Sequence, residues 1–265
     1  MKKTDKGITE EETILKEIED GLRLALKNKL QSYSRETSYM PFQEAILGKK
    51  NTAIYSFGIS ISTWLGQNLK GYEGIAKILA KAVGSEVHLQ YKIPYSITKD
   101  TEKKIYEIYT SILRGEISPD ANTLAKQIKK FAKGKEGIHQ DSVVDVFIKD
   151  KDKNLFIFDI SSPKSNMKEA KSLKLKIMNW TALGYANFKN VKSIYAFIAL
   201  PYNPYHPKEY ARFSTKIFDK SRDILVQDKF WDKIAGFKVY DKLIQTIQKV
   251  GSENMEDLLK KVDGL

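Results

Sequence analysis

Two aspartates, Asp145 and Asp159, stand in short apolar segments near the middle of the chain, and Lys164 follows the second of them. Asp159 lies in the stretch FIFDISSPK, which begins at Phe156. A carboxylate in apolar surroundings is costly unless it is paired or bound to a metal. Two converging carboxylates suit a hard cation such as Mg²⁺, and a nearby lysine can stabilise charge that develops on phosphorus. These residue types indicate metal-assisted hydrolysis of a phosphate ester.

The two aspartates are brought together only if their segments pair as strands. VVDVFI (143–148) and LFIFDI (155–160) are strand-like, and the polar turn KDKDKN (149–154) separates them, so 143–160 is predicted to be a hairpin. Facing side chains of neighbouring antiparallel strands lie within several ångströms of each other. The alternative is that Asp145 faces solvent and Asp159 merely ends its strand. The hairpin alone does not decide between these interpretations.

The remaining pattern predicts an α/β fold, with a central mixed β-sheet flanked by helices. SIYAFIAL (193–200) is a nearly continuous apolar run, typical of a strand that is buried on both faces. We expect a single nuclease domain over 1–265, mainly helical over 1–135, with the catalytic sheet and its flanking helices in 136–265. Helical periodicity predicts helices over 8–31, 68–83, 101–115, 121–133, 167–187, 208–218, 226–234, 238–250 and 253–262.

The composition favours a partner that carries negative charge. The 265 residues include 45 basic and 33 acidic side chains, which gives a net charge of +12. Lysines that neutralise phosphates release counterions, so nucleic acid fits this excess, although a solvated lysine-rich surface is the plain alternative. No basic amphipathic helix with aromatic anchors, membrane-spanning run or signal peptide is apparent. Cysteine is absent, which excludes disulfides and suits the cytoplasm.

Five segments stand out along the chain: 41–83, with Pro41-Phe42, STWLGQ (62–67) and Glu73; then 143–148, 158–166, 199–213 and 216–236. In this order they resemble the TdeIII/MjaII family of type II restriction endonucleases. The spacing of Asp145 and Asp159, with a lysine to follow, is also similar to the pattern of PD-(D/E)xK nucleases. The resemblance implies a restriction-endonuclease-like core with a helical N-terminal region, which cleaves double-stranded DNA with Mg²⁺ at a short palindrome such as GGNCC.

The chain departs from the family pattern at one position. The family's second strand ends in Glu-Ile-Lys, whereas this chain has Asp159-Ile160-Ser161, so serine stands where the lysine is expected. Pro163 cannot continue a central strand, and a turn there could return Lys164 to the site. Lys168 and Lys171 on the following helix are rivals for this role. Loss of catalysis is the third possibility.

Other candidate residues complete the expected site. Glu73 is a candidate third metal ligand, and its alternative is a solvated helix acid paired with Lys77. Lys208, Arg212 and Lys216 recur every four residues and would form one basic helix face for DNA, or simply a solvated face. His139 precedes Asp145 by six residues, and a loop histidine without a role is the preferred interpretation.

Three functions compete. The first is a type II restriction endonuclease, for which a palindromic site favours a twofold homodimer. The second is a structure-specific repair or junction nuclease of the same fold. The third is a sequence-specific DNA-binding protein that has lost catalysis, and Ser161 is the residue that supports it.

Overall fold

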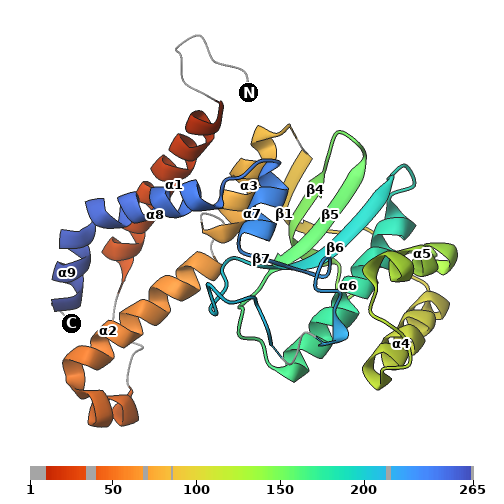
Figure 1. Ribbon diagram of the computed structural model, residues 1–265, viewed down its shortest axis with the longest axis horizontal. Helices are drawn as coiled ribbons and strands as arrows, with labels where there is room; N and C mark the ends of the chain where they lie inside the picture. Colours follow the sequence, from red (N-terminus) through yellow and green to blue (C-terminus); the bar gives the residue numbers. More distant parts are fainter. Residues whose placement is uncertain (1–9, 34–39, 68–70, 85, 213–215, 264–265) are drawn as a thin grey trace. The chain divides into compact units, whose positions relative to one another are not determined.

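A computed structural model describes residues 10–33, 40–67, 71–84, 86–212 and 216–263 (Figure 1). The described residues form two compact units, and the boundary between them falls inside one helix. One unit contains the chain up to Ile78 and from Val239 onward, and the other contains Leu79–Lys238. The expectation of one nuclease domain divided near residue 135 therefore stays a prediction.

The first unit is helical. Its members are α1 (Glu10–Ser32), α2 (Pro41–Gln67), the first part of α3 (Tyr72–Ala82), α8 (Tyr240–Glu253) and α9 (Met255–Asp263). Apolar residues such as Ile18 and Leu22 form the buried face of α1. Arg23 of α1 donates to Glu19 one turn away and to Glu253 of α8, which joins the two helices. Gly48 has a φ of +74°, a value that glycine adopts without strain, and it kinks α2 at that point.

The second unit is built on a five-stranded sheet in the order β1-β4-β5-β6-β7. The pairs β1–β4 and β4–β5 are antiparallel, while β5–β6 and β6–β7 are parallel. A small second sheet pairs β2 with β3. The strands are β1 (Glu86–Lys92), β2 (Ser96–Ile97), β3 (Gly134–Lys135), β4 (Val143–Lys149), β5 (Asn154–Ile160), β6 (Ser193–Leu200) and β7 (Ile224–Val226).

Helices cover both faces of this sheet. Successive residues of a strand point to opposite faces of the sheet, so the side chains of Ile157 and Phe158 pack against the helices on opposite sides. Ile157 belongs to the core cluster that includes Ile177 of α6, whereas the ring of Phe158 contacts Phe230 of α7. The helices that lie wholly within the described part of this unit are α4 (Lys99–Arg114), α5 (Ala121–Phe131), α6 (Met167–Asn187) and α7 (Asp228–Ala235), and α4 to α6 share one side in Figure 1.

α6 is the connection between the parallel strands β5 and β6, and it positions the site. Asn166 caps its first turn by accepting the backbone N–H of Glu169 at 3.0 Å. Gly184 lets the helix approach β6 closely, because a Cβ there would lie 2.6 Å from the Ile194 side chain. The C-terminal part of α6 therefore lies close against β6.

The expected α/β fold with a central mixed sheet flanked by helices is confirmed. The hairpin, the buried strand at 193–200 and the helix at 167–187 lie where the sequence predicts them. The helix expected over 208–218 is wrong, because described residues 208–212 form turns and irregular chain and 216–217 lie in a short 3₁₀ turn. The short strands β1, β2, β3 and β7 were not predicted, since their pairing partners are distant in the sequence.

Candidate active site

The β4–β5 hairpin places Asp145 and Asp159 opposite each other. The register pairs Val146 with Phe158, so these aspartates are the next facing pair. The backbone N–H of Asp145 donates to Asp159 Oδ1 at 3.2 Å, and the N–H of Ile160 donates to Asp145 Oδ2 at 2.9 Å. Each carboxylate is thus fixed by the backbone of the partner strand.

A third strand extends this polar row. Gln90 of β1 lies beside Asp145, and its Nε2 donates to Asp145 Oδ1 at 3.2 Å. The row lies on the face covered by α6, because Phe147 and Ile157, two residues from each aspartate, pack into the core on that side. The two aspartates therefore face each other across the hairpin, and their role as a metal-binding pair stays a prediction.

A positively charged side chain reaches this site from α6. Lys176 Nζ donates to Asp159 Oδ2 in a close ion pair. The two side chains are 28% and 13% exposed, so the pair is largely shielded from water yet open on one side. Lys176 was not among the lysines that the sequence suggested. The signal that could have found it is its place in the helix that returns from β5 across the sheet.

Burial and charge repulsion act together on Asp159. Burial, followed by the negative charge of Asp145, raises the pKa of Asp159 to about 6, while Lys176 opposes the rise. Because the two negative charges repel each other and are partly shielded from water, a positive charge that approaches them stabilises the ionised carboxylates. The pair is therefore electrostatically suited to a cation.

The chemistry of these donors fits a magnesium ion. Mg²⁺ is usually held by one or two carboxylates, together with water and substrate phosphate oxygens. Each carboxylate has about four acceptor sites, so the hydrogen bonds described above leave lone pairs for a metal on Asp145 and Asp159. Across the described ranges, no group of three or more acidic, histidine or cysteine side chains is arranged to hold a metal. A site here would consist of this pair and non-protein ligands.

The lysines predicted from sequence lie elsewhere. Lys164, Lys168 and Lys171 are all exposed. Ser161 continues the backbone pairing, with its N–H donating to Ala199 O at 2.9 Å, and the turn at Pro163 is held by a hydrogen bond from Tyr210 Oη at 2.8 Å. The chain does turn at Pro163 as expected, but the ammonium group that contacts Asp159 belongs to Lys176.

Glu73 was predicted to be a third metal ligand. Glu73 is buried, with 4% exposure, so the alternative of a solvated helix acid is wrong. It belongs to the helical unit, whereas the aspartate pair belongs to the other unit, and its role as a metal ligand stays a prediction.

The basic residues expected to contact DNA do not form a helix face. Lys208 and Arg212 lie in irregular chain, and Lys216 follows residues outside the described ranges. Arg212 Nη1 donates to Tyr205 Oη at 3.3 Å. A DNA contact through these three residues would depend on a loop and not on helical periodicity.

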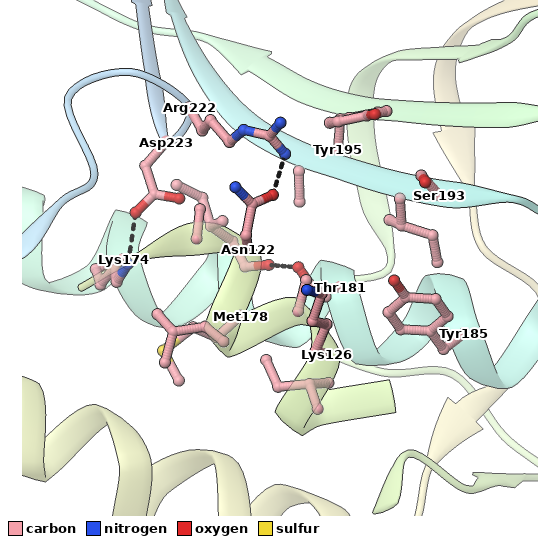
Figure 2. A pocket seen from close by; sticks show the side chains of 17 residues that line it. Asn122, Lys126, Lys174, Met178, Thr181, Tyr185, Ser193, Tyr195, Arg222 and Asp223 are labelled. Carbon is pink, nitrogen blue, oxygen red and sulfur yellow. Dashed lines mark hydrogen bonds and ion pairs between the residues drawn. The ribbon is translucent and has the colours of Figure 1, made fainter. Parts of the chain in front are cut away.

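A separate cavity of about 220 Å³ lies between α5, α6 and the start of β6 (Figure 2). At its edge Lys174 Nζ donates to Asp223 Oδ2 at 2.5 Å, and both side chains are buried. The cavity reaches Ser193–Ala196 of β6, whereas Asp159 is paired with Ile198 further along that strand. It is distinct from the aspartate pair.

Comparison with known proteins gives one family and two relatives. The chain matches the family described as "Type II restriction endonuclease, HinfI" over residues 9–251. It is 23% identical over 240 residues to the type II restriction enzyme HgiEI of Herpetosiphon aurantiacus, covering 88% of this chain and 85% of the relative. It is 21% identical over 235 residues to HgiBI of the same organism, covering 87% and 84%. No solved structure is significantly similar to the chain.

These matches confirm the expected class of type II restriction endonucleases. The family found is HinfI, and the narrower TdeIII/MjaII and PD-(D/E)xK assignments gain no support from them. Within the described parts of the chain, no helix has the length and apolar character needed to cross a bilayer.

Proposed function

The chain belongs to the HinfI family of type II restriction endonucleases, and we propose that it hydrolyses phosphodiester bonds of double-stranded DNA at a short palindrome with Mg²⁺. The observation that carries the proposal is the facing pair Asp145 and Asp159 with Lys176 against it. Two fixed carboxylates and one ammonium group combine a metal site with a positive charge. Metal-assisted hydrolysis of a phosphate ester can use this combination.

Each side chain has a separate task in this proposal. Asp145 and Asp159 would hold the metal, which when bound lowers the pKa of a water molecule and neutralises charge on the phosphate. Lys176 directs its ammonium group into the same space, where it can stabilise the negative charge that develops on phosphorus. Gln90 and the Ile160 N–H keep Asp145 in its orientation. A water molecule attacks phosphorus and loses a proton to the surrounding water, while the bond from phosphorus to one bridging oxygen breaks and that oxygen takes up a proton from water.

The contact between Lys176 and Asp159 explains how the site can contain a lysine although Ser161 stands at the position of the family's lysine. A lysine on the strand is replaced by one from α6, since Lys176 reaches the acid that the strand provides. This arrangement favours an active enzyme over a DNA-binding protein that has lost catalysis. Lys164, the earlier candidate, is exposed, and comparing its substitution with that of Lys176 separates the two assignments.

Binding to DNA would use the positive charge of the chain. The net charge of +12 supplies the electrostatic attraction, and Lys208, Arg212 and Lys216 are the residues proposed to contact DNA. A palindromic site favours a homodimer, because each half-site then meets an identical subunit. GGNCC is the first sequence to test, and we place the reaction in the cytoplasm.

A plasmid digest tests the proposal. The purified protein is incubated with plasmids of known sequence in Mg²⁺, in Mn²⁺ and in EDTA. Discrete bands with either metal, and none with EDTA, are expected. Smearing or cuts confined to junctions would indicate a structure-specific nuclease, and retained binding without cuts would indicate a DNA-binding protein.

A further inference from the structure

Lys176 contacts an aromatic ring as well as a carboxylate. Its Nζ lies 4.8 Å from the centroid of the Trp180 ring. The two residues are four apart on α6 and therefore lie on the same side of the helix. A cation over an indole face is attracted by the ring quadrupole, and the attraction is stronger where water is partly excluded. The ammonium group is thus held between Asp159 and Trp180.

Trp180 is itself fixed by the segment that leads into β4. Its side chain is fully buried, and its indole Nε1 donates to the carbonyl oxygen of Asp141 at 2.8 Å. The neighbouring Asn179 donates from Nδ2 to Asp141 Oδ2 at 2.7 Å. The backbone N–H of Asp141 in turn donates to Nδ1 of the buried His139 at 3.0 Å. One turn of α6 is therefore anchored to the residues just before the strand that carries Asp145.

This anchoring matters because the lysine comes from a helix. A strand lysine would share the rigid alternation of the sheet with its aspartate, whereas Lys176 reaches the site on a long, flexible side chain. Catalytic groups act efficiently when their rotamers are locked by packing and by supporting hydrogen bonds. The ring restricts the lysine from one side, and the bonds to Asp141 fix the ring.

We propose that Trp180 is the positioning residue of this site: its ring holds the Lys176 ammonium group against Asp159, and its indole N–H ties α6 to residues 139–142. The effect of Trp180 on the rate of DNA cleavage rests on the proposed function. The placement of the lysine by the ring is a property of the folded protein and is measurable without DNA.

The test compares Trp180→Leu, which removes the ring, with Trp180→Phe, which keeps a ring and removes the N–H. Trp231→Leu is the matched control, since Trp231 is also buried and its indole N–H also donates to a backbone carbonyl, that of Pro201, at 2.9 Å. Each protein is labelled with ¹³C at lysine Cε. The Lys176 signal is identified by its loss in Lys176→Met.

The expected spectroscopic result is a shifted Lys176 signal, because the methylene beside the ring feels its ring current. Trp180→Leu should move this signal to the position of exposed lysines, Trp180→Phe should move it part of the way, and Trp231→Leu should leave it in place. A Lys176 signal that already coincides with exposed lysines in the unmodified protein would overturn the proposal. If Trp180→Leu does not fold, an unmoved signal in Trp180→Phe would overturn it equally.

Kinetics supply the second measurement. Trp180→Leu should lower kcat on cognate DNA by about tenfold, within the range of cation–π energies, with KM unchanged. In a Lys176→Met background the same change should have no further effect. A full effect in that background would show that Trp180 acts on the fold and not through Lys176. A protein that never cuts DNA would refute the proposed function, and the lysine signal would still decide the role of Trp180.

Discussion

Replacing Lys176 by methionine removes one charge and keeps most of the volume of the side chain. The ammonium group contacts Asp159, and the two side chains are 28% and 13% exposed. Exposed ion pairs are worth up to ~1 kcal/mol, and breaking a fully buried pair costs ~3–5 kcal/mol. A partly shielded pair falls between these limits, at ~2 kcal/mol. This value corresponds to a rise of ~1.5 units in the pKa of Asp159.

The consequence for stability has a defined sign. The pKa of Asp159 is raised to about 6 in the folded protein, above an unfolded value of ~3.9. The contribution of Asp159 to the free energy of unfolding is therefore fully present below pH ~4 and is lost as the pH rises through about 6, by up to ~3 kcal/mol in all. In Lys176→Met the pKa of Asp159 is expected to be higher by ~1.5, so this contribution should continue to fall up to pH ~7.5. The variant should match the unmodified protein at pH 5 and be ~2 kcal/mol less stable at pH 8.

The consequence for activity is larger. A charge that stabilises the transition state contributes ~3–4 kcal/mol when its donor is well placed, so kcat for DNA cleavage should fall by ~10²–10³-fold. Urea unfolding in EDTA at pH 5 and pH 8 measures stability, and single-turnover cleavage measures rate. Lys164→Met and Lys171→Met, at exposed positions, are the controls and should cut normally. Cleavage by Lys176→Met within about threefold of the normal rate, or equal stability at pH 8, would refute the assignment.

Three further predictions follow from the same structure. Asp145→Asn should abolish cleavage and leave DNA binding largely intact in a gel-shift assay, because a metal ligand is lost while a carbonyl acceptor for the Ile160 N–H remains; undiminished cutting would exclude Asp145. Asp223→Ala should lower the free energy of unfolding by ~3–5 kcal/mol in urea denaturation, because it leaves the buried Lys174 charge unpaired; a loss below ~1 kcal/mol would contradict this. Affinity for DNA should fall steeply with salt in a log-log plot, since a chain of charge +12 that contacts phosphates releases counterions, and a flat plot would argue against phosphate contacts.

The sequence by itself determined the hairpin and the facing positions of its two aspartates. Two short apolar runs on either side of a polar turn favour antiparallel pairing, and this pairing places Asp145 opposite Asp159. The apolar run at 193–200 likewise determined a strand buried inside the sheet. These features are local, so the residues that specify them are neighbours in the chain.

Only the tertiary structure decided which lysine joins the pair. Lys176 is 17 residues from Asp159 in the chain and meets it because α6 returns across the sheet. The position of a helix over a sheet depends on packing, here on the close approach at Gly184 and the bonds from Asn179 and Trp180 to Asp141. Side-chain spacing near Asp159 favoured Lys164, which the turn at Pro163 leaves exposed. Contacts of this kind join distant parts of the chain, and local periodicity carries no information about them.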